Sequence, residues 1–179
     1  MLKDIFSQVD RASATVANLL DFTHRDTSAF KPIDIREVLE STAALLDNEL
    51  LLSNVTLRMD LEDNLPKVNG HFQNLQQVFV NIVLNAKEAM PRGGELTIRN
   101  YLQENFVCID ISDTGEGISE KNVSRIFEPF FTTKEVGKGT GLGLSVSFGI
   151  IEKHHGNISV KSQENIGTTF TVQLPSVLK

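Results

Sequence analysis

Cysteine is almost absent from this chain of 179 residues, and long apolar runs are absent altogether. Cys108 is the single cysteine, so no disulfide can form within the chain, which fits a reducing compartment. No apolar run approaches the length of a membrane span, and no secretory signal opens the sequence. We therefore expect a cytoplasmic chain without a membrane segment of its own, whether or not a longer parent protein is anchored elsewhere.

Excess positive charge is also missing. The 17 lysines and arginines are outnumbered by 23 aspartates and glutamates, which leaves a net charge of −6. This balance argues against non-specific binding to nucleic acid. A site for an anion must therefore concentrate positive charge locally, in a chain whose 40% hydrophobic and 22% charged content is ordinary for a soluble globular protein.

The first 28 residues differ from the rest of the chain. Their apolar and small side chains recur at alternating steps of three and four, as in a heptad seam: Leu2, Ile5, Val9, Ala12, Val16, Leu19 and Thr23. So narrow a stripe favours a partner helix in a hairpin or bundle; packing on the helix's own domain is the alternative. A polar break over 24–28 precedes Pro32, so we place a boundary there, between segments 1–28 and 29–179.

Helical and strand patterns alternate after this boundary without a strict βαβ rhythm. This order predicts an α/β two-layer sandwich, in which a mixed β-sheet is covered on one face by helices. The patterns predict helices over 35–51, 72–90 and 141–155, a short helical turn near 123–127, and strands over 55–61, 95–102, 106–112, 157–162 and 168–174. In the first helix we expect Asp34 to be the N-cap and four side chains to face inward: Val38, Leu39, Leu45 and Leu46.

Four glycines fall within the seven positions 137–143, directly before the apolar run 144–151. A loop with so few side chains exposes its backbone N–H groups. A helix that begins near Gly141 would point its free N–H groups and its positive dipole end at this loop, which suits a phosphate. A plain flexible turn is the alternative.

The helix predicted over 72–90 carries a narrow polar stripe: Asn74, Gln77, Asn81, Asn85 and Glu88. Asparagine is a mediocre helix former, so three on one stripe call for a reason other than solvation of a surface. A row of amides facing a polar ligand is one such reason. Amide oxygens suit Mg²⁺, which keeps several waters and bridges phosphate oxygens, and we assign the metal to Asn85.

Asp113 stands at the end of an apolar strand and is followed by Gly115 and Gly117, which let a backbone approach a flat ring. A carboxylate there can accept a hydrogen bond from the exocyclic amine of adenine. Thr168, at the start of the last strand, can reach the same ring through water. A simple Asp-Thr-Gly turn and an ordinary β-branched strand residue are the alternatives.

Three phenylalanines lie in the irregular segment 126–134 and are costly to leave in water. They must pack on this domain as a latch or on a partner. Lys134 and Lys138 flank the glycine-rich loop, where they can meet the β- and γ-phosphates or simply remain solvated.

Taken in order, these segments resemble the ATP-binding domain of bacterial sensor histidine kinases, within the wider group that includes gyrase, Hsp90 and MutL. Residues 77–86 resemble the N box, 113–117 the G1 box, 127–134 the F box of nitrogen-regulator-type kinases, 139–144 the G2 box and 167–170 the final threonine box. The likeness covers residues 34–174. It implies a Bergerat fold with residues 119–140 as a mobile lid over ATP.

The resemblance also implies a set of site residues. Asn81, Asn85 and Lys134 would carry the catalysis, and Asn85 would hold Mg²⁺. The residues implied for ATP or ADP are Asn81, Asn85, Glu88, Asp113, Gly115, Gly117, Ile118, Phe130, Thr133, Lys134, Lys138, Gly139, Thr140, Gly141, Leu142, Gly143, Leu144 and Thr168.

Residues 1–28 resemble the second helix of the dimerisation and phosphoacceptor hairpin. In this family the acceptor is a histidine followed by an acid on the first helix, whereas His24 is followed by Arg25. We therefore expect a kinase core that lacks its own acceptor histidine. Its implied partners are the acceptor helix of the same kinase, the receiver domain of a response regulator, and a second copy in the homodimeric parent.

Asn81 separates this chain from gyrase-like hydrolases, which carry glutamate at that position. A carboxylate can accept a proton from an attacking water, whereas a carboxamide cannot, and loss of a general base costs ~10²–10⁴ in rate. The site is therefore expected to hold ATP for a histidine nucleophile, by placement and charge neutralisation. Glu88 and Glu128 remain candidates to assist the histidine. The alternatives are a nucleotide-gated interaction module of the same fold and an ATPase.

Overall fold

The structure is a computed structural model that describes residues 30–134 and 139–177. The heptad helix expected over 1–28, with its dimerisation role, and the expected contact of Lys138 with phosphate therefore lie outside the described residues. None of the helices in the described ranges combines the length and apolar character needed to cross a membrane.

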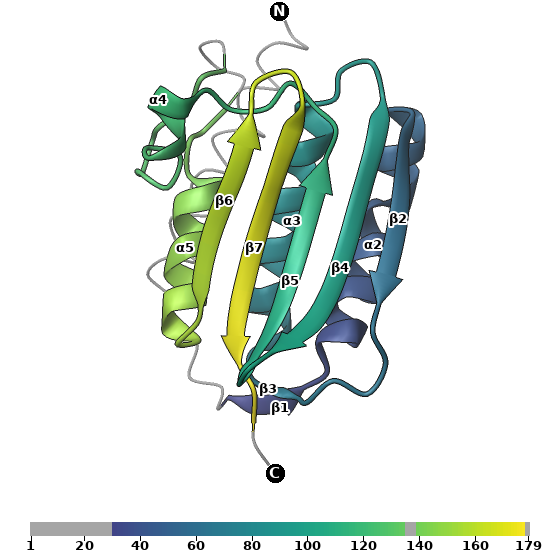
Figure 1. Ribbon diagram of the computed structural model, residues 1–179, viewed down its shortest axis with the longest axis vertical. Helices are drawn as coiled ribbons and strands as arrows, with labels where there is room; N and C mark the ends of the chain where they lie inside the picture. The colour runs from purple at the N-terminus through teal and green to yellow at the C-terminus, as the bar shows by residue number, and fades with distance from the viewer. Residues whose placement is uncertain (1–29, 135–138, 178–179) are drawn as a thin grey trace, which may run out of the picture.

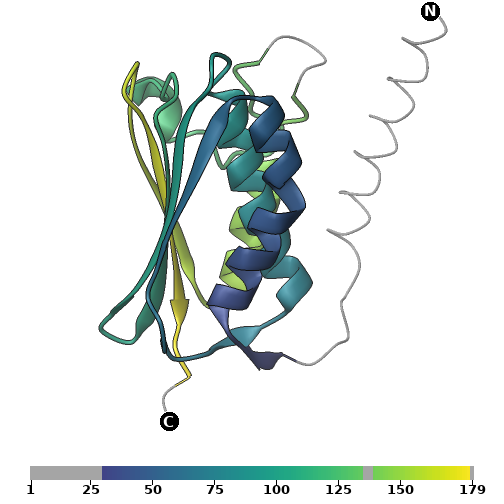
Figure 2. The same cartoon turned by 90° about the vertical axis from the view of Figure 1, so that its right-hand side faces the viewer.

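Five strands form one mixed sheet in the order β2-β4-β5-β7-β6 (Figure 1). Their bounds are β2 Val55–Leu61, β4 Gly94–Gln103, β5 Phe106–Asp113, β6 Asn157–Gln163 and β7 Gly167–Pro175. β2 and β4 run parallel, and every other neighbouring pair is antiparallel. Figure 2 shows the helices packed on one face of this sheet, which confirms the predicted two-layer α/β sandwich.

Three longer helices make the second layer: α2 Ile35–Leu52, α3 Phe72–Glu88 and α5 Gly143–Lys153. Asp34 caps α2 as predicted, because its Oδ1 accepts a hydrogen bond from the Arg36 backbone N–H at 2.9 Å. The central helix, α3, buries one continuous stripe that includes Leu75, Phe79 and Ile82, all without measurable exposure. This stripe is what fastens the predicted polar row of α3 in a defined orientation relative to the sheet.

The prediction that Leu45 faces inward is wrong, because its side chain is 62% exposed. The other three predictions for this helix are confirmed, since its buried residues are Ile35, Val38, Leu39, Thr42, Leu46 and Leu50. At about 100° per residue, Leu45 lies just beyond Val38, which bounds the buried arc of the helix on that side.

The bounds of two other predicted helices also change. α5 begins at Gly143 rather than residue 141, because Gly141 has a φ of +65° that lies outside the right-handed helix region. The short helix α4 spans Glu120–Val123 rather than 123–127. Ile126 and Phe127 instead turn inward, where Phe127 packs on Phe148 with ring centroids 5.5 Å apart.

A second, two-stranded sheet was not predicted. β1 Lys31–Ile33 pairs antiparallel with β3 Val68–Gly70. Strands of three residues are too short to show the alternation of apolar and polar side chains by which a strand is found in a sequence. This small sheet lies at the end of the molecule where α3 begins and α5 ends (Figure 1).

Candidate functional site

The ends of two strands and two helices meet at the opposite end of the sheet. β5 ends there at Asp113, β7 begins at Gly167, α3 ends at Glu88 and α5 begins at Gly143 (Figure 1). The antiparallel register pairs Asp113 directly with Thr168. The fold therefore brings the candidate residues of α3, the β5 end and the α5 start to one end of the sheet.

Asp113 is a buried carboxylate with one oxygen in use. Its side chain is 8% exposed, and Oδ1 accepts hydrogen bonds from the backbone N–H groups of Gly115 at 2.9 Å and Thr168 at 3.3 Å. Burial raises the pKa of this carboxyl, while the two backbone donors act in the opposite direction. Oδ2 accepts no hydrogen bond from the part of the chain that the structure describes, so it can receive a donor from a ligand.

Gly115 and Gly117 serve the packing of the loop itself. A Cβ on Gly115 would overlap the carbonyl of Ala89, and one on Gly117 would overlap the carbonyl of Gln163. Gly117 also has a φ of +70°, which side chains rarely adopt. The Glu116 N–H donates to the Ala89 carbonyl at 2.9 Å, so the loop after Asp113 is fastened to the end of α3.

Ser162 is a site residue that the sequence reasoning missed. Its Oγ accepts the Ile118 N–H at 2.7 Å and lies 2.9 Å from Thr168 Oγ1. The hydroxyl of Thr168 is thus engaged by Ser162, and the predicted water-mediated contact of Thr168 with a ring stays a prediction. The hairpin register, which places Ser162 opposite Thr168, is the signal that can find it, once the turn between β6 and β7 is known.

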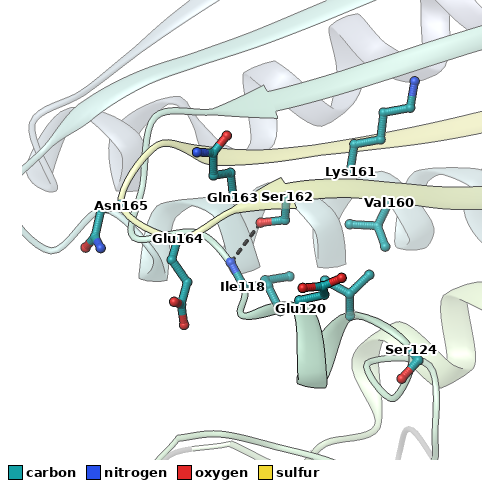
Figure 3. A pocket seen from close by; sticks show the side chains of 10 residues that line it. Ile118, Glu120, Ser124, Val160, Lys161, Ser162, Gln163, Glu164 and Asn165 are labelled. Atoms are coloured by element: carbon teal, nitrogen blue, oxygen red, sulfur yellow. Dashed lines mark hydrogen bonds between the residues drawn. The ribbon is translucent and has the colours of Figure 1, made fainter.

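A pocket of about 880 Å³ lies between α4 and the β6–β7 hairpin (Figure 3). Ile118 and Ser162 line it, together with Glu120, Lys161 and Glu164. Asn85, Asp113 and Lys134 do not line it. We therefore regard it as a neighbour of the site rather than as the site itself.

The polar residues of α3 make two different kinds of contact. Asn81 points at the start of α5, where its Nδ2 donates to the Gly143 carbonyl and to Ser147 Oγ, each at 3.2 Å. Asn81 therefore joins α3 to α5 through its amide nitrogen, which the picture of a row of amides facing a ligand did not anticipate. A ligand role for Asn81 is left to its oxygen and remains a prediction.

Asn85 and Glu88, about one and two turns beyond Asn81 on α3, both contact the ammonium of Lys134. The Lys134 ammonium donates to Asn85 Oδ1 at 3.4 Å and forms an ion pair with the Glu88 carboxylate. Oxygen atoms of an amide and a carboxylate are the donors that Mg²⁺ prefers. No group of three His, Cys, Asp or Glu side chains suited to a metal occurs in the described ranges, so Mg²⁺ at Asn85 would draw its other ligands from phosphate and water.

The start of α5 offers unused N–H groups. Its first helical hydrogen bond runs from the Val146 N–H to the Leu142 carbonyl at 2.9 Å, and no side chain caps this helix end. The N–H groups of residues 143–145 precede that bond and have no partner within the helix. Thr140 Oγ1 accepts the Leu142 N–H at 3.3 Å and shapes the approach. This end suits an anion, as the glycine pattern predicts.

The phenylalanine-rich segment is partly packed. The guanidinium carbon of Arg125 lies 4.4 Å from the ring centroid of Phe131. Phe130, in contrast, is 68% exposed and adopts a φ of +65°. The Phe130 N–H donates to the Gly141 carbonyl at 2.9 Å and joins this segment to the glycine-rich loop. Thr133 is exposed. Phe127 and Phe131 therefore pack on this domain, whereas for Phe130 the alternative of packing on a partner stays a prediction.

Comparison with known proteins gives concordant results. Residues 70–178 match the family described as histidine kinase-, DNA gyrase B- and HSP90-like ATPase. Sporulation kinase E of Bacillus subtilis (strain 168) is 38% identical over 172 residues, which are 96% of this chain and 23% of that kinase. The chain thus spans about a quarter of that relative's length.

Solved structures agree with this assignment. The catalytic domain of histidine kinase ThkA superposes with a TM-score of 0.75 at 30% identity, over 83% of this chain and 97% of that domain. A second structure, histidine kinase ThkA in complex with response regulator protein TrrA, has a TM-score of 0.79 at 25% identity over 97% of this chain and 49% of that one. The chain therefore belongs to the histidine kinase-, DNA gyrase B- and HSP90-like ATPase family, and its described part is an ATP-binding catalytic domain of the histidine-kinase type.

Proposed function

We propose that this chain binds Mg-ATP and donates the γ-phosphoryl group to a histidine on an acceptor helix, as the catalytic part of a sensor histidine kinase. The observation that supports the proposal is that three features lie together at one end of the sheet. These are the open oxygen of Asp113, the uncapped start of α5 and the amide oxygen of Asn85. They supply a purine contact, a phosphate contact and a metal ligand in that order.

Each part of the nucleotide then has a partner. Asp113 Oδ2 accepts the adenine amine, with Gly115, Gly117, Ile118 and Thr168 shaping that end. The residues proposed for the phosphates are Lys134, Lys138 and the stretch Gly139, Thr140, Gly141, Leu142, Gly143 and Leu144, flanked by Phe130 and Thr133. Asn85 holds Mg²⁺, which when bound neutralises phosphate charge. Asn81 completes the set through its oxygen.

Transfer to histidine is favoured over hydrolysis. The side chain of Asn81 is a carboxamide, which cannot act as a general base. Its amide nitrogen donates hydrogen bonds to Gly143 and Ser147. Of the acids considered, Glu88 pairs with Lys134 and Glu128 pairs with Arg125 at 3.2 Å. Both carboxylates are thus engaged by a cation of the chain in the structure. The site is therefore suited to positioning and charge neutralisation.

The partners follow from the same reasoning. We propose that residues 1–28 form the second helix of a dimerisation hairpin, that residues 29–179 form the catalytic domain, and that residues 119–140 act as its lid. The similarity to ThkA, which was solved with a response regulator protein, supports a receiver domain as the final phosphate acceptor. A homodimeric parent protein in the cytoplasm completes the proposal.

A reconstitution experiment tests it. The 179-residue chain is mixed with a separately produced acceptor hairpin from a related histidine kinase and with ATP labelled at the γ-phosphate. We expect acid-labile label on the hairpin, and much less of it with Asp113→Asn when ATP is kept below saturation. Tight nucleotide binding without transfer would favour an interaction module instead, and steady phosphate release at gyrase-like rates would favour an ATPase.

A further inference from the structure

Lys134, the last residue of the phenylalanine-rich segment 126–134, reaches the last turn of α3. Asn85 and Glu88 are three residues apart on that helix, so they share one face and can hold the same ammonium. Lys87, which lies between them in sequence, points elsewhere and pairs with Glu49 of α2 at 2.8 Å. The contact of Lys134 with Asn85 and Glu88 is therefore specific to one face of α3.

The ammonium and a divalent cation cannot share this place. Lys134 occupies Asn85 Oδ1 in the structure, and Mg²⁺ is proposed to use the same oxygen, where two positive ions would repel each other. The phosphates of a nucleotide offer Lys134 an alternative anionic partner. Lys134 thus has two competing anions, the Glu88 carboxylate within the chain and the polyphosphate of the ligand.

We propose that Glu88 holds Lys134 on the metal ligand Asn85, so that Mg-ATP must displace an internal cation before it binds. The inference rests on the proposed function, because it takes Asn85 as the metal ligand and Lys134 as a phosphate contact. Glu88 is then a positioning residue that sets nucleotide affinity and the magnesium requirement through Lys134. In this role Glu88 acts through Lys134 and not through the direct nucleotide contact that the family resemblance implies.

The size of the effect follows from exposure. The Lys134 and Glu88 side chains are 37% and 46% exposed. An ion pair this open to water is weak, so releasing Lys134 is expected to tighten Mg-ATP by about two- to fivefold. The same change lowers the magnesium concentration needed for half-saturation at fixed ATP.

A double-mutant cycle on the whole chain separates this role from others. Titration calorimetry measures the Kd for Mg-ATP in the unaltered chain, in Glu88→Gln, in Lys134→Met and in the double variant. We expect Glu88→Gln to lower the Kd in the unaltered background and to have no effect once Lys134 is Met. Glu49→Gln, which breaks the neighbouring Lys87 pair, is the matched control and should leave the Kd unchanged.

Each other outcome overturns the inference in a recognisable way. A Kd raised by Glu88→Gln in both backgrounds would mean that Glu88 itself attracts the metal. A Kd lowered in both would mean that Glu88 repels phosphate directly, without Lys134. An unchanged Kd would mean that the Lys134–Glu88 ion pair does not affect nucleotide binding. If the unaltered chain binds no Mg-ATP, the proposed function fails as well, whereas the preceding outcomes leave it intact.

Discussion

Asp113 and Thr168 face each other across β5 and β7, and the Thr168 N–H donates to Asp113 Oδ1 at 3.3 Å. Together with the Gly115 N–H, this bond occupies the first oxygen, and the second has no hydrogen-bond partner among the described residues. The carboxylate is thus oriented by backbone groups that no side-chain substitution removes. A purine contact built in this way depends on strand register rather than on a mobile loop.

Asp113→Asn is expected to lower ATP affinity about 10- to 100-fold, because the amide presents a donor where the adenine amine needs an acceptor. The fold should survive, since Asn keeps an oxygen for the two backbone donors.

The substitution is also not expected to lower stability at pH 7. Burial raises the pKa of Asp113 above its ordinary value, so ionising this carboxyl in the folded chain lowers stability as pH rises above that ordinary value. Calorimetry should show the lost affinity while thermal unfolding at pH 7 shows no loss of stability. Unchanged affinity would contradict the purine assignment.

Asn85→Ala is expected to abolish detectable Mg-ATP binding without unfolding the chain. Its side chain is half-buried, its side-chain hydrogen bond within the described residues is with Lys134, and alanine is a better helix former. Binding is followed by calorimetry with and without Mg²⁺, and helix content by circular dichroism. Asn74→Ala, on the same stripe of α3 but more than two turns away, is the control. Equal loss in both variants would argue against a metal role for Asn85.

Ser162→Ala tests the link that connects Ile118 to Thr168. Removal of this hydroxyl leaves the Ile118 N–H and the Thr168 hydroxyl short of a partner, at a cost of about 1–3 kcal/mol in the free energy of unfolding. Urea unfolding measures this cost. Ser159→Ala, at an exposed position of the same strand, should change it by less than about 0.5 kcal/mol. Similar values for the two variants would show that the link contributes nothing.

His154 makes the stability of the domain depend on pH. It is 3% exposed, its Nε2 accepts the His71 N–H at 3.1 Å, and its Nδ1 lies 2.7 Å from the Ile150 carbonyl. Burial lowers the pKa of His154, with His71 and His155 acting in the same direction and the Ile150 carbonyl against it. The neutral ring with its proton on Nδ1 satisfies both contacts.

The sign of the dependence follows from linkage. Below the ordinary histidine pKa the unfolded chain binds a proton that the folded chain excludes, so stability falls as pH drops through that window and is full above it. One such group contributes at most about 1.4 kcal/mol per pH unit. Urea unfolding between pH 7.5 and about 5 measures the slope. His154→Gln should flatten it and His155→Gln, at an exposed position, should not; an equal slope in His154→Gln would contradict the assignment.

Local patterns were enough for most elements. The α3 stripe of Leu75, Phe79 and Ile82 marks a helix with one buried face, and the glycines before residue 144 mark where the next helix begins to within two residues. Leu45 was misplaced because it lies at the margin of the apolar face of α2, and the sequence pattern does not say how wide the buried part of that face is. β1 and β3 escaped prediction because three residues show no period.

The sequence by itself determined which chemistry this protein carries: a carboxylate at a strand end, amides along one helix and a glycine-rich loop before another. These signals are local, because they depend on neighbours within a turn or a strand. Only the tertiary structure decided how the parts are used, as Asn81 contacts Gly143 across 62 positions and Lys134 meets Glu88 across 46. Such contacts depend on how α3 packs beside α5 and its loop, and no short-range periodicity encodes that packing.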